Sequence, residues 1–573
     1  MLLAMLWVAH ATSLGFAGTS SRPAAPFLHA RHAAVASDSR AASEAGVDAL
    51  KAGGNAVDAA CATALALGVV NPFASGLGGG GFALVYQAKA GIKPSRAIAL
   101  DFRETAPAAL AADPSEKTDI RPQSGLSVGV PGEARGLADL VRRYGKLPFS
   151  RCVEPALKLS RGFSVSPWLA QHIQDEITRN PDSGPKLIGK IFSIDQQAAR
   201  RLRTGDQVGR PNLTATLERL AREGAEVLYQ GELARSIVGE VRAAGGVLTL
   251  DDLTRYAPVD RLPLTTTFLG HRILVMPPPS AGGTIQIEVL GILANHATSL
   301  KREESPVSPG YLHLLVEALK HGFADRAHFL GDPAFTRVPL EHLLDVSYHR
   351  ELAGRIRDDR VLGHRDYGTF DRPAGGPARD AGTAHISVVD KAGNAVALTT
   401  TINLEFGSRI VASGIVLNNE MDDFARTTGS PNIYGADVFS LSGSEANLPR
   451  PGKRPVSSMS PTIVLGDRGV EMVAGAAGGP RIVSATLQLM LDVLVFGHDA
   501  RQAMTSPRIH HQWEPEILYF EPATPSETLR ALENIGHRTR SRADIGKANL
   551  ILRSTLGLDV AADPRSGGEP AGY

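Results

Sequence analysis

The hydrophobic pattern of the first hundred residues predicts helices followed by strands. Residues 36–70 carry apolar residues at helical spacing, and Gly53-Gly54 interrupts them as a helix stop. A glycine loop at 76–81 comes next, followed by the strand-like run FALVY (82–86). Alternation in RAIALDFRE (96–104) predicts a second strand, ending at Asp101-Phe102-Arg103.

The pattern then becomes mostly helical over residues 132–245. HRILVMPPPSAGG (271–283) predicts a strand and a proline-rich turn, and 309–330 predicts another helix. GTFDRPAGGPARDAG (368–382) has no apolar periodicity and predicts a flexible surface loop.

Beyond this loop the pattern predicts strands joined by tight turns. Residues 383–404 read as strand, turn and strand, and further strands are expected at GIVLNN (414–419) and PTIVL (461–465). A glycine turn at Gly478-Gly479 leads into a helix over 481–497. Sequential hairpins mixed with helices indicate an α/β protein with layered, largely antiparallel sheets.

Composition narrows the function classes. The 573 residues hold 60 Lys+Arg against 59 Asp+Glu, so no electrostatic footprint for nucleic acid or an anionic membrane surface is expected. Two cysteines, Cys61 and Cys152, exclude a disulfide scaffold and a cysteine-based metal site, although one bridge between them remains open. The chain has 59 glycines, which is about 10% of its residues against a usual ~7%, and this excess requires an explanation.

Residues 1–22 form an apolar leader of signal-peptide length that lacks a positive n-region. We interpret it as a weak export signal, which favours a periplasmic or secreted location without excluding the cytoplasm. No later segment offers 18 uncharged apolar residues, so no transmembrane helix is predicted.

Two short motifs match known chemistry in the wrong context. Residues 76–81 satisfy the dinucleotide pattern GxGxxG, but a helix precedes them and a strand follows, the reverse of what that fingerprint needs. The GxSxG around Ser127 lacks a preceding strand, which argues against a nucleophile elbow. The histidines lack metalloprotease spacing, and we predict no metal or organic cofactor.

Thr383 is the residue best placed to act as a nucleophile, because it opens a strand directly after the loop that ends at Gly382. If peptide cleavage makes this threonine N-terminal, its own α-amino group, with a reference pKa of about 7.7–8.0, can accept the hydroxyl proton. Polar residues that an acyl-transfer site would need follow at 401–403, 418–423 and 457–458.

The chain resembles the γ-glutamyltransferases, or glutathione hydrolases, of the N-terminal nucleophile superfamily. The matching stretches occur in family order: KAGGNAVDAA (51–60), GLGGGGF (76–82), LDFRETAP (100–107), GLSVGVPGE (125–133), MPPPSAGG (276–283), TAHISVVDKAGNAVALTTTINLEFGS (383–408), SGIVLNNEMDDF (413–424), RPVSSMSPTIV (454–464) and AAGGPRI (476–482). Each is weak alone, and their joint occurrence is specific.

The resemblance implies a role for each matching residue. Thr383 corresponds to the nucleophile of both self-cleavage and catalysis, Thr401 to the threonine that orients it, and Gly478-Gly479 to the oxyanion hole. Arg103 corresponds to the arginine that grips the donor α-carboxylate, a task that suits a planar guanidinium. The remaining matches are Ser457 and Ser458 for the same carboxylate, Asn403, Glu420 and Asp423 for the α-ammonium, and Tyr434 for a lid over the pocket.

The resemblance also implies an architecture and a reaction. It predicts a four-layer αββα sandwich formed jointly by two pieces, 23–382 and 383–573, after cleavage between Gly382 and Thr383. A γ-glutamyl ester on Thr383 would form from glutathione or a related amide. Water, an amino acid or a dipeptide would then accept the acyl group.

Two alternatives remain open from the sequence. A cephalosporin or β-lactam acylase shares the scaffold, but it need not keep the clamp of Arg103, Asp423 and Ser457-Ser458. A catalytically silent binding protein would have lost Thr383 or Thr401, and both are present. One departure is Glu405, which stands where relatives carry Thr or Tyr and which could alter pH dependence or the hydrolysis-to-transfer balance.

Overall fold

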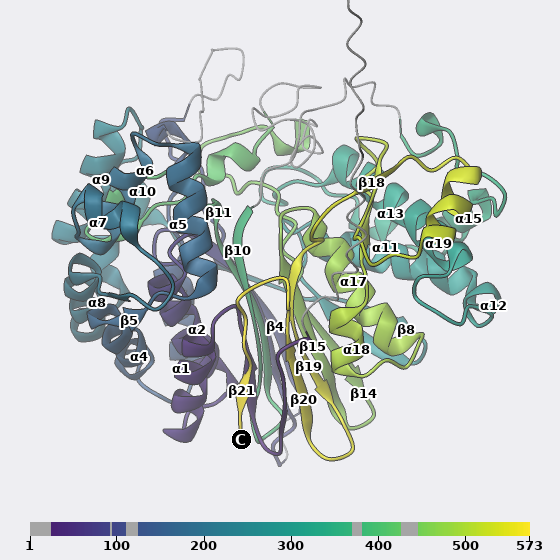
Figure 1. Cartoon of the computed structure of the whole chain (residues 1–573), viewed down its shortest axis with the longest axis horizontal. Helices are drawn as coiled ribbons and strands as arrows, with labels where there is room; N and C mark the ends of the chain where they lie inside the picture. The colour runs from purple at the N-terminus through teal and green to yellow at the C-terminus, as the bar shows by residue number, and fades with distance from the viewer. Residues whose placement is uncertain (1–23, 92–93, 111–123, 369–380, 426–444) are drawn as a thin grey trace, which may run out of the picture.

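The computed structural model describes residues 24–91, 94–110, 124–368 and 381–425, together with 445–573. The predicted leader, most of the loop predicted over 368–382, and Tyr434, the predicted lid residue, lie outside these ranges. Two seven-stranded sheets pack face to face at the centre, with a helical layer outside each (Figure 1). The predicted αββα sandwich is confirmed.

Every strand pairing within these two sheets is antiparallel, as predicted. The first sheet runs in the order β21 (Ala571–Gly572), β2 (Ala34–Ala36), β10 (Ala381–Val389), β11 (Ala395–Leu404), β3 (Gly80–Gln87), β4 (Arg96–Asp101) and β7 (Val259–Arg261). The second runs β1 (Phe27–Ala30), β20 (Leu558–Ala562), β19 (Lys547–Arg553), β15 (Gly469–Ala477), β14 (Thr462–Gly466), β9 (His271–Val275) and β8 (Leu264–Phe268).

The left-hand helical layer of Figure 1 lies on the first sheet. It comprises α1 (Arg40–Lys51), α2 (Ala56–Val70), α3 (Glu133–Tyr144), α4 (Phe149–Arg161), α5 (Pro167–Arg179), α6 (Gly184–Phe192), α7 (Gln196–Arg201), α8 (Pro211–Glu223), α9 (Gly231–Ala243) and α10 (Leu250–Arg255). The right-hand layer comprises α11 (Gly282–Asn295), α12 (Ala297–Leu300), α13 (Pro309–Phe329), α14 (Leu340–Leu343), α15 (Val346–Arg355), α17 (Arg481–Leu494), α18 (Ala500–Thr505) and α19 (Ser526–Asn534).

Helix α2, which packs against the first sheet, shows how local residues fix the bounds of an element. Gly53 adopts φ +95°, which ends the preceding helix, and Asn55 then caps α2 through a reciprocal capping box with Asp58. The apolar helix is buried along almost its whole length. It therefore forms an internal support rather than an amphipathic surface helix.

The uninterrupted apolar run of β3 is explained by its two buried faces. Ala83 and Val85 belong to the core that includes α1 and α2. Phe82 and Leu84 point the other way and belong to the core that includes the second sheet and the right-hand helices. Successive side chains of a strand point to opposite faces, so a strand buried on both sides has no polar positions to alternate with.

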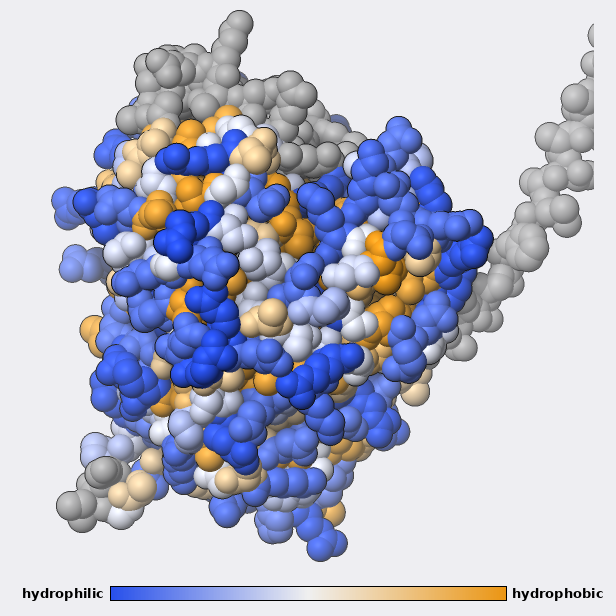
Figure 2. All heavy atoms as spheres, turned by 90° about the vertical axis from the view of Figure 1, so that its left-hand side faces the viewer, coloured by the Kyte–Doolittle hydropathy of each residue, from blue (hydrophilic) through white to orange (hydrophobic). Residues whose placement is uncertain are grey.

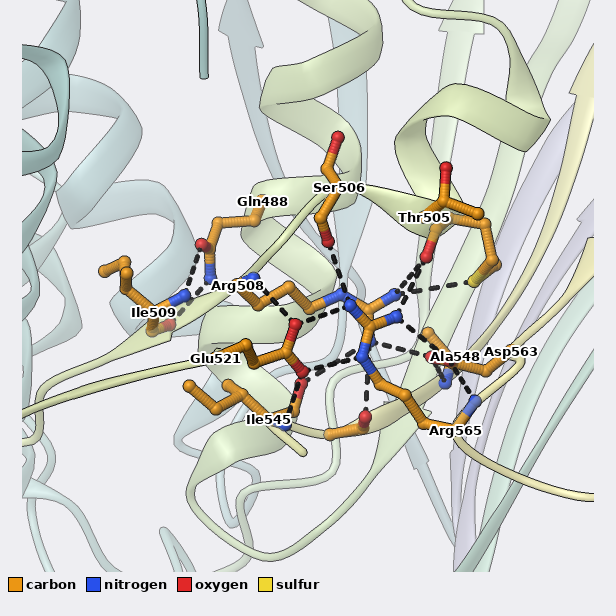
Figure 3. A network of polar contacts seen from close by, with 12 residues as sticks. Gln488, Thr505, Ser506, Arg508, Ile509, Glu521, Ile545, Ala548, Asp563 and Arg565 are labelled. Carbon is orange, nitrogen blue, oxygen red and sulfur yellow. Dashed lines mark hydrogen bonds and ion pairs between the residues drawn. The ribbon is translucent and has the colours of Figure 1, made fainter. Parts of the chain in front are cut away.

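A buried ionic network lies where the chain leaves β20 of the second sheet (Figure 3). Arg508 pairs with Asp563 at 2.7 Å, and Arg565 pairs with Glu521 at 2.6 Å and with Asp563 at 3.0 Å. The network joins the segment after α18 to the segments that follow β17 (Leu518–Phe520) and β20.

The left-hand face of the molecule is largely polar, with apolar side chains in separate small areas (Figure 2).

Within the described residues, no helix has the length and apolar content needed to cross a bilayer. Both cysteines are buried and form no disulfide. The predicted strand at 414–419 is much shorter than expected, with only β13 (Ile415–Val416) pairing to β12 (Val411–Ala412).

Candidate active site

The β10–β11 hairpin places Thr383 at a local irregularity in the first sheet. Gly382 lies opposite Asn403 and Thr383 lies opposite Thr401, so the register shifts between two consecutive residues of β10. Asn403, on the bulged strand, adopts φ +73°. Bulges of this kind re-aim side chains next to active sites.

Thr401 connects the Thr383 hydroxyl to the preceding peptide bond. Its Oγ1 lies 3.1 Å from the Oγ1 of Thr383 and donates a hydrogen bond of 2.6 Å to the carbonyl oxygen of Gly382. The backbone N–H of Asn403 donates to the same Oγ1 at 2.8 Å. Because the single Thr401 proton goes to Gly382, the Thr383 hydroxyl must be the donor in its own contact with Thr401.

The glycine loop predicted at 76–81 allows two backbones to meet beside this hairpin. Gly80 and Gly81 pair with Thr401 and Thr400 of β11. A Cβ at Gly79 would lie 2.9 Å from the carbonyl carbon of Thr401 and closer still to its oxygen. The glycines of this motif thus serve close packing, not phosphate binding.

Arg103, directly after β4, lies at the centre of a buried acidic cluster. Its Nη1 donates to Glu420, and its Nη2 donates to Asp423 and, at 3.2 Å, to the carbonyl oxygen of Val456. Its Nε donates to the carbonyl oxygen of Pro455 at 3.3 Å, and Glu104 lies 3.9 Å from Nη1.

Burial and charge act in opposite directions in this cluster. Burial lowers the pKa of Arg103, but the carboxylates of Glu420, Asp423 and Glu104 outweigh it, so its pKa is raised. Burial raises the pKa of Glu104 to about 8 and also raises those of Glu420 and Asp423, with Arg103 opposing the rise in each. The Arg103 charge is therefore the main counterweight to three buried acids.

Two further loops complete the site. Ser457 and Ser458 lie on the segment before β14, where the Ser457 N–H donates to Pro279 and its carbonyl accepts from Ala281. Gly478 and Gly479 lie between β15 and α17 with φ of +127° and +61°, which favours glycine at both positions. Among the described residues, no hydrogen bond is donated by the N–H of either glycine.

These residues surround one small pocket. Of the residues predicted from the sequence, it is lined by Arg103, Thr383, Thr401, Asn403, Glu420, Asp423, Ser457, Ser458 and Gly479. Gly478 precedes the last of these but does not line the pocket itself. Met459 and Ile482 add apolar walls.

Sequence reasoning missed one charged residue of the pocket, Arg326 of α13. Nearly all of α13 is buried, so an arginine there is unusual, and this was the available signal. No matching motif includes the residue, because α13 lies outside the stretches that carry the resemblance.

Glu405 does not line the pocket. Its carboxylate accepts a hydrogen bond from Arg179, and its Oε1 lies 3.0 Å from the Nδ1 of His172. Burial raises the pKa of Glu405, but His172 and Arg179 together lower it below its usual range. Arg179 and His172 of α5 therefore hold the Glu405 carboxylate outside the set of residues that line the pocket of Thr383.

The other sequence motifs have structural roles. Ser127 lies buried in a 3₁₀ turn (Gly125–Ser127) and donates to the carbonyl oxygen of Ser124, so it is no nucleophile elbow.

His313, Glu317 and His537 are grouped closely enough to hold a metal ion. However, Lys320 lies 3.3 Å from Glu317, and the two histidines hydrogen-bond each other at 2.8 Å.

Comparison with known proteins gives a consistent result. A model of the gamma-glutamyltranspeptidase family matches residues 42–573. The chain is 37% identical over 555 residues to the glutathione hydrolase proenzyme of Escherichia coli, covering 94% of this chain and 91% of that protein. It is 38% identical to glutathione hydrolase 2 of Arabidopsis thaliana, covering 95% and 94%.

Solved structures agree on the fold. A cephalosporin acylase from Bacillus halodurans matches with a TM-score of 0.81 at 26% identity, over 99% of both chains. A gamma-glutamyltranspeptidase from Pseudomonas nitroreducens complexed with L-DON matches with a TM-score of 0.51 at 33% identity, over 56% of this chain and 94% of that one.

Proposed function

The chain belongs to the gamma-glutamyltranspeptidase family, and from this premise we propose how its residues carry out γ-glutamyl hydrolysis and transfer. The central assignment is that Thr383 is the nucleophile, first of its own cleavage and then of catalysis. The observation that carries it is the Thr401 hydroxyl, which contacts both the Thr383 hydroxyl and the Gly382 carbonyl.

Self-cleavage begins with attack of Thr383 Oγ1 on the carbonyl carbon of Gly382. The Thr401 hydroxyl polarises this carbonyl through its 2.6 Å hydrogen bond and stabilises the oxyanion that forms. The Gly382–Thr383 C–N bond then breaks, the nitrogen takes the hydroxyl proton, and an ester joins Gly382 to Thr383 Oγ1. Water hydrolyses this ester to the Gly382 carboxylate and the Thr383 hydroxyl, which leaves Thr383 N-terminal with the α-amino group that the preceding step released.

The fit of Gly382 in the sheet supports this position for the cut. A Cβ there would lie 2.5 Å from the carbonyl oxygen of Phe73 and 2.8 Å from that of Leu404. Any side chain would displace the carbonyl that Thr383 attacks.

In the cleaved enzyme, the free α-amino group takes the proton as Thr383 Oγ1 attacks the γ-carbonyl of the donor. The N–H groups of Gly478 and Gly479 donate to the tetrahedral oxyanion, and the amine leaves with the proton. The γ-glutamyl ester is then transferred to water, an amino acid or a dipeptide. Every step uses groups of this chain and of the substrates.

Donor recognition depends on opposite charges placed side by side. Arg103, Ser457 and Ser458 receive the α-carboxylate, while Asn403, Glu420 and Asp423 receive the α-ammonium. Glutathione and related γ-glutamyl compounds carry this pair of charges at the required distance from the γ-amide.

The proposal divides the chain into a large piece, 23–382, and a small piece, 383–573, which together form one αββα unit. Residues 1–22 are proposed to act as an export leader, placing the enzyme in the periplasm or outside the cell. Tyr434 stays a proposed lid residue.

A cephalosporin acylase is the second candidate, because the Bacillus halodurans enzyme shares the architecture over the full chain. The buried cluster of Arg103, Glu420 and Asp423 favours the γ-glutamyl assignment. A substrate without an α-ammonium would leave two buried carboxylates without a cationic ligand.

The test is a denaturing gel of the purified protein with N-terminal sequencing and a γ-glutamyl-p-nitroanilide assay. We expect two bands, the smaller starting at Thr383, and release of p-nitroaniline. Thr383→Ala should give a single inactive chain, whereas Thr383→Ser, which keeps a hydroxyl, should still cleave. A single uncleaved band that turns over the anilide would overturn the mechanism.

A further inference from the structure

The pocket contains two guanidinium groups, and hydrogen-bond partners among the described residues are found for only one of them. Arg103 donates from Nε, Nη1 and Nη2 to two carboxylates and two backbone carbonyls. A guanidinium has five N–H donors, so Arg103 has at most one left for a ligand without breaking a contact.

Arg326 is the opposite case. It lines the same pocket as Thr383, is only 4% exposed, and its Nε and Nη1 are enclosed without any hydrogen-bond partner. A buried guanidinium with two unpartnered nitrogens loses part of the solvation of its charge without compensation. Such a group fits a site that receives an anionic ligand.

The acceptors of the pocket show the complementary feature. Glu420 Oε2 and Asp423 Oδ1 are enclosed and receive no N–H or hydroxyl donor from the described residues, although the other oxygen of each carboxyl group is bound by Arg103. Arg326, Glu420 and Asp423, which carry these unpartnered atoms, line one cavity. Together they match the carboxylate and the ammonium of a zwitterion.

We propose that Arg326 is a second guanidinium ligand of the donor α-carboxylate, so that two arginines, not one, select γ-glutamyl compounds. This rests on the proposed function and deepens it. Arg103 keeps the acidic residues in place and offers its remaining N–H, while Arg326 provides the free donors. The nearby Asp423 attracts Arg326, and Arg103 repels it.

The test uses three competitive inhibitors of γ-glutamyl-p-nitroanilide hydrolysis. L-Glutamate has both α-groups, glutarate lacks the α-ammonium, and 4-aminobutyrate lacks the α-carboxylate. Arg326→Gln should raise the inhibition constants of L-glutamate and glutarate by about tenfold or more, and leave that of 4-aminobutyrate within about twofold. Arg326→Lys, which keeps the charge but loses the fork, should fall between wild type and Arg326→Gln.

Controls separate ligand contact from a structural role. Arg222→Gln removes one positive charge from an exposed position on α8 and should change none of the three constants. Self-cleavage of each variant is followed on gels first, and Arg326→Lys carries the test if the glutamine variant does not cleave. If an analogue does not inhibit measurably, the α-amide of the γ-glutamyl anilide replaces 4-aminobutyrate as a substrate without the carboxylate.

An equal rise in all three constants would show that Arg326 only supports the pocket, and no rise would show that it does not meet the ligand. Either result overturns this inference while leaving the proposed function intact. A wild-type protein that does not hydrolyse the γ-glutamyl anilide would overturn the proposed function itself.

Discussion

Gly79 gives the sharpest test of how the glycine loop serves catalysis. A Cβ at this position would lie 2.9 Å from the Thr401 carbonyl carbon and 2.9 Å from Ile402 Cγ2, whereas ordinary contact begins at 3.4 Å. The obstructing group is main chain in the centre of a sheet, so it cannot rotate away. Gly79→Ala therefore requires β11 to shift by at least 0.5 Å at Thr401.

The expected consequence is loss of chemistry before loss of fold. A 1 Å misplacement near a reacting centre can cost about 100-fold in rate, so we expect Gly79→Ala to slow self-cleavage and turnover by roughly 10- to 100-fold. Overpacking of this kind also costs about 1–3 kcal/mol of stability, which lowers the melting temperature by a few degrees.

The assay follows the fraction of cleaved chain on denaturing gels over time, together with p-nitroaniline release and thermal unfolding. Gly239→Ala on α9 is the matched control, because a Cβ there meets no atom within 4 Å. It should cleave and turn over normally. Normal self-cleavage and turnover in Gly79→Ala would refute the link between the loop and Thr401.

Three further predictions concern other parts of the molecule. Thr401→Val keeps the shape but removes the hydroxyl that contacts Gly382 and Thr383, so self-cleavage should slow by about 100-fold or more on a gel time course; cleavage at the wild-type rate would exclude this role. Arg103→Lys should mainly raise KM for the γ-glutamyl anilide, because it loses the forked contact; an unchanged KM would place the carboxylate elsewhere. In the ionic network of Figure 3, burial raises the pKa of Asp563, but Arg508 and Arg565 outweigh it and lower the pKa to about 2. The folded pKa lies below the unfolded value of about 3.8, so this carboxylate stabilises the fold above pH 4 by about 2 kcal/mol and loses that contribution as the pH falls towards 2. Asp563→Asn should flatten the acid limb of a urea-unfolding series, and an unchanged limb would contradict the assignment.

Much of the fold could be predicted from local pattern. The stop at Gly53-Gly54, the strand after the glycine loop and the β10–β11 hairpin each depend on nearby residues, which hydrophobic spacing and turn residues report directly. The sequence pattern overestimates the length of β13, because distant backbone groups, and not a strand partner, hold the polar pair Asn418-Asn419. Asn418 donates to the carbonyl oxygens of Gly78 and Gly129.

The site was predictable where a motif carried it and not elsewhere. Residues such as Thr383 and Asp423 lie in recognisable stretches, so the resemblance could place them. Arg326 lies on a helix whose sequence reads only as buried, and only packing of α13 against the small piece brings it to the pocket. The contact between Glu405 and α5 likewise depends on two segments more than 200 residues apart.

The order of strands in the two sheets affects how the protein would unfold and refold. In the first sheet, β11 and the part of β10 from Thr383 onward belong to the proposed small piece and lie between β2 and β3 of the proposed large piece. In the second, β20, β19, β15 and β14 lie between β1 and β9. A cut at Gly382–Thr383 would leave all of these pairings in place, so dilution would not separate the pieces. It would, however, turn refolding from a reaction within one chain into an encounter between two, with a yield that depends on protein concentration. If the chain is cut as proposed, recovery from denaturation would be efficient for the uncut precursor and poor for the cleaved enzyme.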